Sequence, residues 1–477
     1  MGIRVVSALI KQAAQEADIP VKVSLETMIP GKVNKLEDLI EAADAVFCSS
    51  RFFDASLAQE VIALASRKDV PVVAGGYGPT FNREFFKGAT IVRGEFEPVA
   101  SQLIEDLFRG RLVPEYDSRE KPTWDYCHSY VWPDRALPSN QLFTKLTGRR
   151  RKSQTWMAGC NNFCTYCSAV RMQRGGGEKG VRHRRAGDII AEIETMGLKR
   201  GDILFLTDNN TALIPREVLV PVLSFLKNRG IYMMTEAALA PLLIDYEEHG
   251  PDKSLLKLMS TKDGQGGCIG LAYGADDLVR TKVAGSTDKD LPALLKGAPI
   301  LRELRIPLNL MTIVGLDNHT YPETFFQVAA VFEAVGAPTD LFFIATPYKT
   351  AREREPKGWG DIVYEQGRVN TQKKTTDFNH HEVVFRPQGM TEIQLQQGFY
   401  WLWRQRYSPA RIMETFRRNF DARVAATNPF LTSLLTGLAW GAFKYLGLRE
   451  LSAGGYIDKQ TQRFLDEEYR LWKKRNA

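Results

Sequence analysis

Three cysteines lie close together in the segment AGCNNFCTYCSAV. Cys160, Cys164 and Cys167 form a C-x₃-C-x₂-C pattern, whereas the other three cysteines of the chain are single and distant in sequence. Three thiolates on one short loop can bind three corners of an iron–sulfur cubane, and full ligation by cysteine usually needs four. The pattern therefore predicts a cluster with one iron left open for a substrate or cofactor.

Two alternatives remain for these cysteines. A structural zinc site is one, with His183 as the fourth ligand, although closed zinc sites normally pair two short ligand elements. Three buried cysteines with no common ligand are the other. Six cysteines in 477 residues are too sparse for a disulfide scaffold. The N-terminal sequence has no signal-peptide pattern, so we expect a cytoplasmic protein.

The composition is that of an ordinary globular protein, with 44% hydrophobic and 25% charged residues. The length predicts two or three domains. The net charge of +7 is a mild excess over this length. It allows an anionic substrate or a membrane surface, and it does not indicate a nucleic-acid partner.

Helical and strand patterns alternate in the first domain, which we place at residues 1–112. The strands are expected at 21–25, 45–49, 70–76 and 89–95, and the helices at 4–17, 36–43, 55–66 and 98–108. This alternation predicts an α/β fold with a doubly wound parallel sheet. Such a sheet should open with a strand, yet the chain opens with a helical pattern, so we expect the first strand to be missing or to have been cut off.

A second series of strands and helices follows a predicted linker at residues 113–152, which contains the basic run TGRRRKS. Strands are expected at 155–159, 202–210, 231–237, 266–274, 307–317 and 340–347. Helices are expected at 188–196, 218–227, 291–304 and 321–335. We therefore predict a partial (β/α)₆ barrel at residues 153–347. Residues 348–477 are expected to form a loop and a helical cap.

The cysteine loop, with Tyr166 as the aromatic residue before Cys167, resembles that of the radical S-adenosylmethionine (radical SAM) superfamily. Five further segments follow in the order that is typical of the superfamily's branch with an N-terminal cobalamin-binding domain. They are VRHRRAGDIIAEIE, FLTDNN, IVGLDNHTYPETF, ATP and HHEVVFRPQGMT. VVAGGYGPT and IVRGEFEP look like the end of that domain. The resemblance covers roughly residues 30–420. The branch includes methyltransferases acting on unactivated carbons and the anaerobic magnesium-protoporphyrin monomethyl ester cyclase.

The resemblance implies a specific chemistry. The three cysteines would bind a [4Fe–4S] cluster, and the open iron would chelate the amino and carboxylate groups of S-adenosylmethionine. One electron, from an external donor such as flavodoxin or ferredoxin, cleaves the sulfonium and yields a 5′-deoxyadenosyl radical that abstracts hydrogen from a small-molecule substrate. The cofactors carry this chemistry, while the protein orients and shields them.

The resemblance also assigns positions along the barrel. Tyr166 would contact S-adenosylmethionine, and the loop Asp208, Asn209 and Asn210 would lie near its methionine part; a turn or a helix cap is the alternative for the loop. Independently of the resemblance, Glu236 is a carboxylate at the end of an otherwise apolar strand, which makes it a candidate for contact with a ribose hydroxyl or a cationic substrate group; a structural role is the alternative.

The following strand departs from the family. The family commonly has G-I-E there, and Ala272 stands in place of the glutamate, so Tyr273 or Glu236 is expected to substitute. Gly315 matches the strand that packs against adenine, where glycine allows close approach of the backbone; a plain strand turn is the alternative.

Ligands of open α/β sheets bind at the carboxyl ends of the strands. For cobalamin these are the loops at Ser49 and Ser50 and at Gly75, Gly76 and Gly78. No D-x-H-x-x-G motif is present, so no histidine of that motif would ligate cobalt. The alternative is a degenerate domain that only covers the barrel.

The sequence favours a radical SAM enzyme that transfers a methyl group to carbon through cobalamin. A radical cyclase or oxidative rearrangement, with or without cobalamin, is the first alternative, and a non-catalytic iron–sulfur carrier or sensor is the second. His380 and His381 are candidate acid/base groups or ordinary loop histidines. Residues 428–443 form an apolar stretch that packs internally or contacts a membrane interface.

Overall fold

The computed structural model describes residues 2–26, 33–119, 125, 127, 130–133, 149–162, 164–168, 172, 181–274, 291–350, 357–408, 410–413 and 458–476. The chain divides into two compact units. The cysteine unit comprises Met1–Gln141, Met157–Arg184 and Pro347–Asn379. The barrel unit comprises Leu142–Trp156, Arg185–Thr346 and His380–Ala477.

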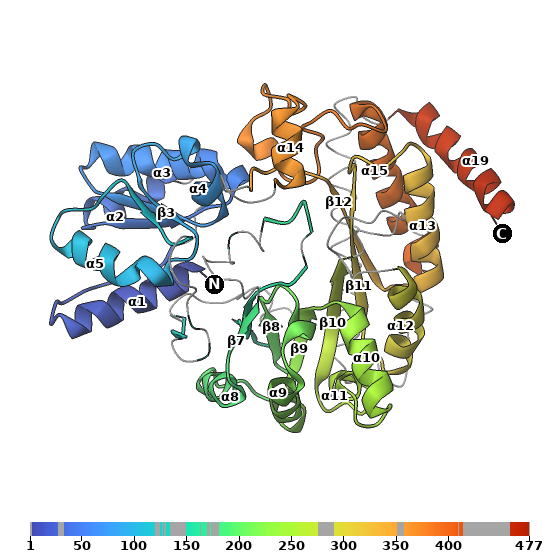
Figure 1. The fold of residues 1–477 in the computed structure, drawn as a ribbon, viewed down its shortest axis with the longest axis horizontal. Helices are drawn as coiled ribbons and strands as arrows, with labels where there is room; N and C mark the ends of the chain where they lie inside the picture. Colours follow the sequence, from blue (N-terminus) through green and yellow to red (C-terminus); the bar gives the residue numbers. More distant parts are fainter. Residues whose placement is uncertain are drawn as a thin grey trace. The chain divides into compact units, whose positions relative to one another are not determined.

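The cysteine unit contains a four-stranded parallel sheet in the order β1-β2-β3-β4. Its strands are β1 (Val46–Ser49), β2 (Val72–Gly75), β3 (Thr90–Arg93) and β4 (Glu115–Asp117). Helix α3 (Ala55–Arg67) packs on the face that carries Cys48 and Ala74. Helices α1 (Gly2–Glu16) and α5 (Ala100–Phe108) lie side by side on the face that carries Phe47 (Figure 1). Helices on both faces are what the alternating pattern predicts for a parallel sheet.

Two strand predictions in this region were wrong. Residues 21–25 form no strand, and residues 115–117 form β4 inside the predicted linker. In a doubly wound order such as 2-1-3-4-5 the second strand pairs only with the first. Because no described strand lies outside β1, residues 21–25 have no neighbour to pair with, whatever their β-propensity.

The barrel unit contains six parallel strands in the order β12-β11-β10-β9-β8-β5. They are β5 (Arg151–Gln154), β8 (Ile203–Leu206), β9 (Tyr232–Glu236), β10 (Gly267–Gly274), β11 (Leu308–Val314) and β12 (Thr339–Ile344). The helices between them are α8 (Ala186–Thr195), α9 (Arg216–Asn228), α10 (Leu239–His249), α11 (Leu255–Met259), α12 (Leu291–Glu303) and α13 (Glu323–Val335). In Figure 1 these helices lie along one side of the row of strands. The predicted partial barrel is confirmed.

The first barrel strand lies earlier than predicted. Residues 151–152 belong to the predicted linker but start β5, which pairs with β8. A basic run is usually solvated, but Arg150 forms an ion pair with the buried Asp202, with 2.7 Å between Nη2 and Oδ2. The predicted strand at 155–159 supplies only β6 (Met157–Gly159), which pairs antiparallel with β7 (Val181–His183).

The C-terminal region adds further helices, namely α14 (Trp359–Glu365) in the cysteine unit, and α15 (Glu392–Tyr407) and α19 (Lys459–Asn476) in the barrel unit. The hydroxyl of Thr391 accepts a hydrogen bond from Gln394 N and caps α15. No described helix is both long and apolar enough to cross a membrane. The apolar stretch at 428–443 lies outside the described residues.

Helix α15 is joined to β12 by a buried ion pair between Arg406 and Asp340. The Asp340 side chain is 1% exposed, and burial raises its pKa to about 6 despite the guanidinium beside it. Asp340→Ala leaves the arginine buried without its partner, so we expect the free energy of unfolding to fall by about 3–5 kcal/mol.

Urea denaturation checks this prediction. The double variant Asp340→Leu/Arg406→Met removes both charges and should recover most of the loss, because a well-packed apolar pair replaces a buried ion pair at little cost. A loss below about 1 kcal/mol in Asp340→Ala would show that the pair does not anchor α15, since such values are typical of exposed ion pairs.

Candidate functional site

The three cysteines of the motif lie in the connection between β6 and β7. Cys160 directly follows β6, and both Cys160 and Cys164 are buried, while Cys167 is partly exposed. The backbone N–H of Cys167 donates to the carbonyl of Cys164 at 3.0 Å, which closes a tight turn. The backbone N–H of Asn162 donates to Cys160 Sγ at 3.5 Å. One short loop therefore presents three sulfur donors.

The donor set fits an iron–sulfur cluster in its chemistry. Among the described residues, no group of three His, Cys, Asp or Glu side chains is arranged to hold a metal ion. Two of the three distant cysteines are poor ligands, because burial raises the pKa of Cys48 to about 11 and that of Cys268 to about 12. Thiols with such pKa values stay protonated near neutral pH.

The strand that follows the cysteine loop is tied to the sheet of the cysteine unit. Arg182 of β7 forms a bidentate ion pair with Glu95, with 2.9 and 2.7 Å between nitrogen and oxygen atoms. The Arg182 side chain is only 9% exposed and that of Glu95 only 11%. Arg184 is fully buried, and its guanidinium carbon lies 3.8 Å from the centre of the Tyr130 ring. The basic run at these two positions is therefore buried rather than solvated.

The loops predicted to contact cobalamin pack closely on one another. A Cβ on Gly76 would lie 2.8 Å from the carbonyl oxygen of Ser50, and one on Gly78 would lie 2.9 Å from the backbone of Arg51. The Gly78 N–H donates to Ser50 O, and the Ser50 N–H donates to Gly75 O. The chain's own backbone thus fills the space these glycines leave, so they do not form an open cradle for a corrin.

Asp208 connects the ends of the first two barrel strands. Its Oδ1 accepts a hydrogen bond from the backbone N–H of Trp156 at 2.7 Å, and Trp156 is fully buried. Asn210 Oδ1 accepts from Ala238 N at 2.9 Å, while its buried Nδ2 has no hydrogen-bond partner among the residues that the structure describes. These oxygen atoms hold the strand ends together, which is the structural alternative for this loop. Asn209 is partly exposed.

Glu236 and Tyr273, the two residues predicted to contact S-adenosylmethionine from neighbouring strands, lie on opposite faces of the barrel sheet. Glu236 pairs with Ala272, and Ala272 pairs with Asn309, so these three share a face. Tyr273 lies on the other face, where it is 1% exposed. Glu236 therefore shares the face of Ala272, whereas Tyr273 points away from that face.

We call the face that carries Glu236 the inner face, because α13 and α15 pack on the other one through Phe342. At the amino ends of the strands, Ile203 of β8 and Tyr232 of β9 lie on the inner face and pack with Ile269, so this end of the inner face is filled by side chains. Toward the carboxyl ends the inner-face side chains remain partly exposed, namely Phe205, Met234, Glu236, Ala272, Asn309, Met311, Ile313, Leu341 and Phe343. His380 and His381 lie beside Phe343, with ring centres 6.1 and 6.4 Å away.

Gly315 follows β11 in a left-handed conformation, with φ +97, and a Cβ there would lie 2.7 Å from the Leu395 side chain. Its backbone N–H donates to Nδ1 of His319 at 3.0 Å. His319 is fully buried and was missed from the sequence, because nothing in its spacing separates it from an ordinary loop residue. It fixes the turn in which the predicted adenine contact lies.

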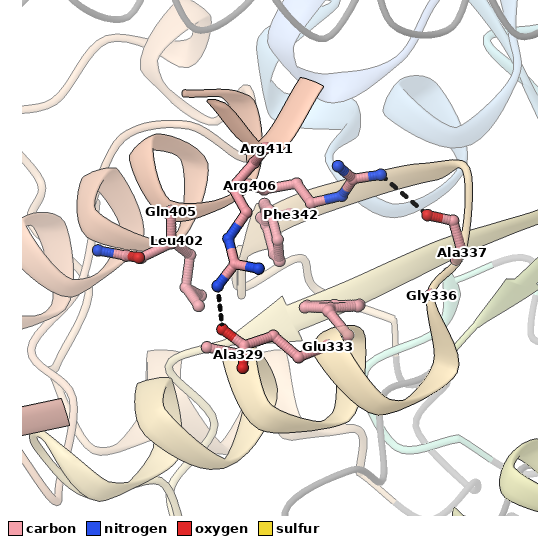
Figure 2. Close-up of a pocket in the computed structure, with 10 residues that line it drawn as sticks. Ala329, Glu333, Gly336, Ala337, Phe342, Leu402, Gln405, Arg406 and Arg411 are labelled. Carbon is pink, nitrogen blue, oxygen red and sulfur yellow. Dashed lines mark hydrogen bonds and ion pairs between the residues drawn. The ribbon is translucent and has the colours of Figure 1, made fainter. Parts of the chain in front are cut away.

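A pocket lies on the outer side of the barrel and is therefore separate from these residues. Figure 2 shows its lining, to which Phe342 of β12, Glu333 of α13 and Arg411 contribute. Arg411 donates to Glu333 Oε1 at 2.6 Å, and Arg406 donates to the carbonyl of Ala337 at 2.9 Å. Since Phe342 lies on the face opposite Glu236, this pocket does not open to the inner face.

Comparison with known proteins identifies the class of fold. No family model matches the chain, and no curated protein matches its sequence. Among solved structures the chain shares the fold of a radical SAM methyltransferase. That protein is TsrM from Kitasatospora setae.

The structure of TsrM with cobalamin and a [4Fe–4S] cluster bound matches this chain with a TM-score of 0.63 and 17% sequence identity. The match covers 94% of this chain and 96% of the TsrM chain. With tryptophan substrate and the SAM analogue aza-SAM bound, it has a TM-score of 0.62 and 16% identity over the same shares. The likeness confirms the predicted architecture.

The buried His319 makes stability depend on pH. Burial lowers its pKa to about 4, against 6.5 for an ordinary histidine. Its contribution is fully present above pH 6.5 and is lost as the pH falls through 6.5 toward 4, because the unfolded chain binds the proton first. We expect a loss of about 3 kcal/mol over this window.

Unfolding free energies measured in urea between pH 7.5 and 4 test this expectation, and the variant His319→Gln should remove the corresponding slope. His249→Gln, which replaces an exposed histidine of the same unit, is the control and should keep the slope. An unchanged slope in His319→Gln would mean that His319 does not titrate in this range.

Proposed function

We propose that the chain is a radical SAM enzyme that transfers a methyl group from S-adenosylmethionine to a carbon of a small molecule, with cobalamin as methyl carrier. The observation that carries this proposal is a C-x₃-C-x₂-C loop beginning six residues after β5, the first strand of a barrel whose fold matches TsrM over 94% of the chain. TsrM, a methyltransferase with a tryptophan substrate, favours methyl transfer over cyclisation.

Each part of the site has a defined task in this proposal. Cys160, Cys164 and Cys167 hold the [4Fe–4S] cluster and leave one iron open to the amino and carboxylate groups of S-adenosylmethionine. When bound, the cluster and S-adenosylmethionine supply an electron-transfer centre and an activated methyl group. The hydrogen bond from Trp156 N to Asp208 Oδ1 holds the chain where it leaves β5 for the cysteine loop.

The inner face supplies orientation and exclusion of water. Its partly exposed apolar side chains, among them Met234, Met311 and Phe343, would cover reacting groups and keep solvent from them. Glu236 provides a carboxylate on the same face, able to accept hydrogen bonds from a ribose hydroxyl or a substrate cation. Tyr166, Asn209 and Gly315 complete the proposed contacts to S-adenosylmethionine.

The fold supports the binding of cobalamin, whereas the glycines of the loop after β2 do not. The loops after β1 and β2, with Ser49, Ser50 and Gly75, lie at the carboxyl edge where ligands of such sheets bind. The space at Gly76 and Gly78 is filled by backbone, so corrin contacts would have to come from other atoms of these loops.

Anaerobically reconstituted protein tests the proposed function. With iron, sulfide, S-adenosylmethionine, cobalamin and an added flavodoxin as electron donor, we expect about four irons per chain. S-adenosylhomocysteine should appear as the mark of methyl transfer. Formation of 5′-deoxyadenosine alone would favour the cyclase or rearrangement alternative. No turnover of S-adenosylmethionine at full cluster loading would contradict the proposal.

The cysteine variants identify the ligands. Cys160→Ala, Cys164→Ala and Cys167→Ala should each lose most of the iron and the turnover of S-adenosylmethionine, because only three thiolates hold the cluster. Cys127→Ala is the matched control, since Cys127 is partly exposed and lies outside the loop, and it should retain both. Retention of iron in all three loop variants would exclude these cysteines as the ligand set.

A further inference from the structure

Asn162 is a buried amide within the cysteine loop. Its side chain is 3% exposed, and its Nδ2 has no hydrogen-bond partner in the described part of the chain. Its neighbour Asn161 is exposed. The backbone N–H of Asn162 already points to Cys160 Sγ, at 3.5 Å. A side-chain donor without an acceptor therefore lies two residues from the first thiol of the motif.

A buried donor without an acceptor is costly. Leaving such a group unsatisfied costs about 1–3 kcal/mol, and buried polar groups of native proteins nearly always have partners. An apolar residue at this position would avoid that cost. The described part of the neighbouring chain offers no acceptor for Nδ2, so we look for the acceptor of this buried asparagine in a group that the loop binds.

We propose that Asn162 is a positioning residue that donates a hydrogen bond from Nδ2 to a sulfur of the bound cluster, a sulfide or a cysteine thiolate. The proposal rests on the proposed function, since it requires the cluster at Cys160, Cys164 and Cys167. Sulfur atoms of a cluster accept hydrogen bonds, and these bonds are one of the factors that set its reduction potential.

The expected effect has a definite sign. Reduction adds an electron to the cluster, so its sulfur atoms become more negative and accept the hydrogen bond more strongly. The bond therefore stabilises the reduced form and raises the potential. An asparagine does this without adding a charge, which distinguishes its effect from that of a nearby lysine or arginine.

Two leucine variants form a matched pair. Asn162→Leu removes the buried donor with little change in volume, and Asn161→Leu makes the same change at the adjacent exposed position. Potentiometric titration of the reconstituted protein, followed by the electron paramagnetic resonance of the reduced cluster, gives the midpoint potential. We expect a more negative potential in Asn162→Leu and the wild-type value in Asn161→Leu.

The protein without cluster supplies an independent readout. There Asn162→Leu should unfold at the same or a higher urea concentration than the wild type, because it removes an unsatisfied donor. Asn162→Ser retains a smaller donor, so its potential should lie between those of the wild type and Asn162→Leu. It replaces the leucine variant in the titration if the leucine variant loads less iron.

The outcomes separate a failure of the role proposed for Asn162 from a failure of the proposed function. An unchanged or more positive potential in Asn162→Leu, or a clear destabilisation of its cluster-free form, overturns the role of Asn162. Either result leaves the proposed function standing when the wild type still binds iron and turns over S-adenosylmethionine. A wild type that binds no cluster refutes the proposed function itself.

Discussion

The hydrogen bond from Trp156 N to Asp208 Oδ1 is the interaction on which the arrangement of the barrel site depends. It joins the chain after β5 to the loop after β8, and Gln154 reinforces it by accepting from the Trp156 indole at 2.7 Å. Both loops are thereby held at the carboxyl edge of one parallel sheet. In sequence, Cys160 follows Trp156 by only four residues.

Much of the fold could be predicted because its signals are local. Alternating apolar strands and amphipathic helices are read over short windows, and the C-x₃-C-x₂-C loop needs only its spacing. The strand at 21–25 failed because pairing needs a neighbour, and sequence shows propensity but not partners. The strand at 151–154 was hidden in a basic run, since its stability comes from pairing with β8 and from Asp202.

The site was only partly predictable for a similar reason. The face that Glu236 and Tyr273 each occupy depends on the register with neighbouring strands, which the sequence alone does not show. Gly76 was expected to serve a ligand but makes room for Ser50 of the adjacent loop. His319 and Asn162 are recognisable only from burial and missing partners, which no spacing reveals.

The central claim is that one iron has no ligand from the polypeptide and binds S-adenosylmethionine. Electron–nuclear double resonance of the reduced cluster, with S-adenosylmethionine carrying ¹⁵N in its amino group, measures this contact directly. We expect a resolved coupling between that nitrogen and the cluster. A fully loaded cluster that shows no coupling while S-adenosylmethionine is bound, or a site that contains zinc, would contradict it.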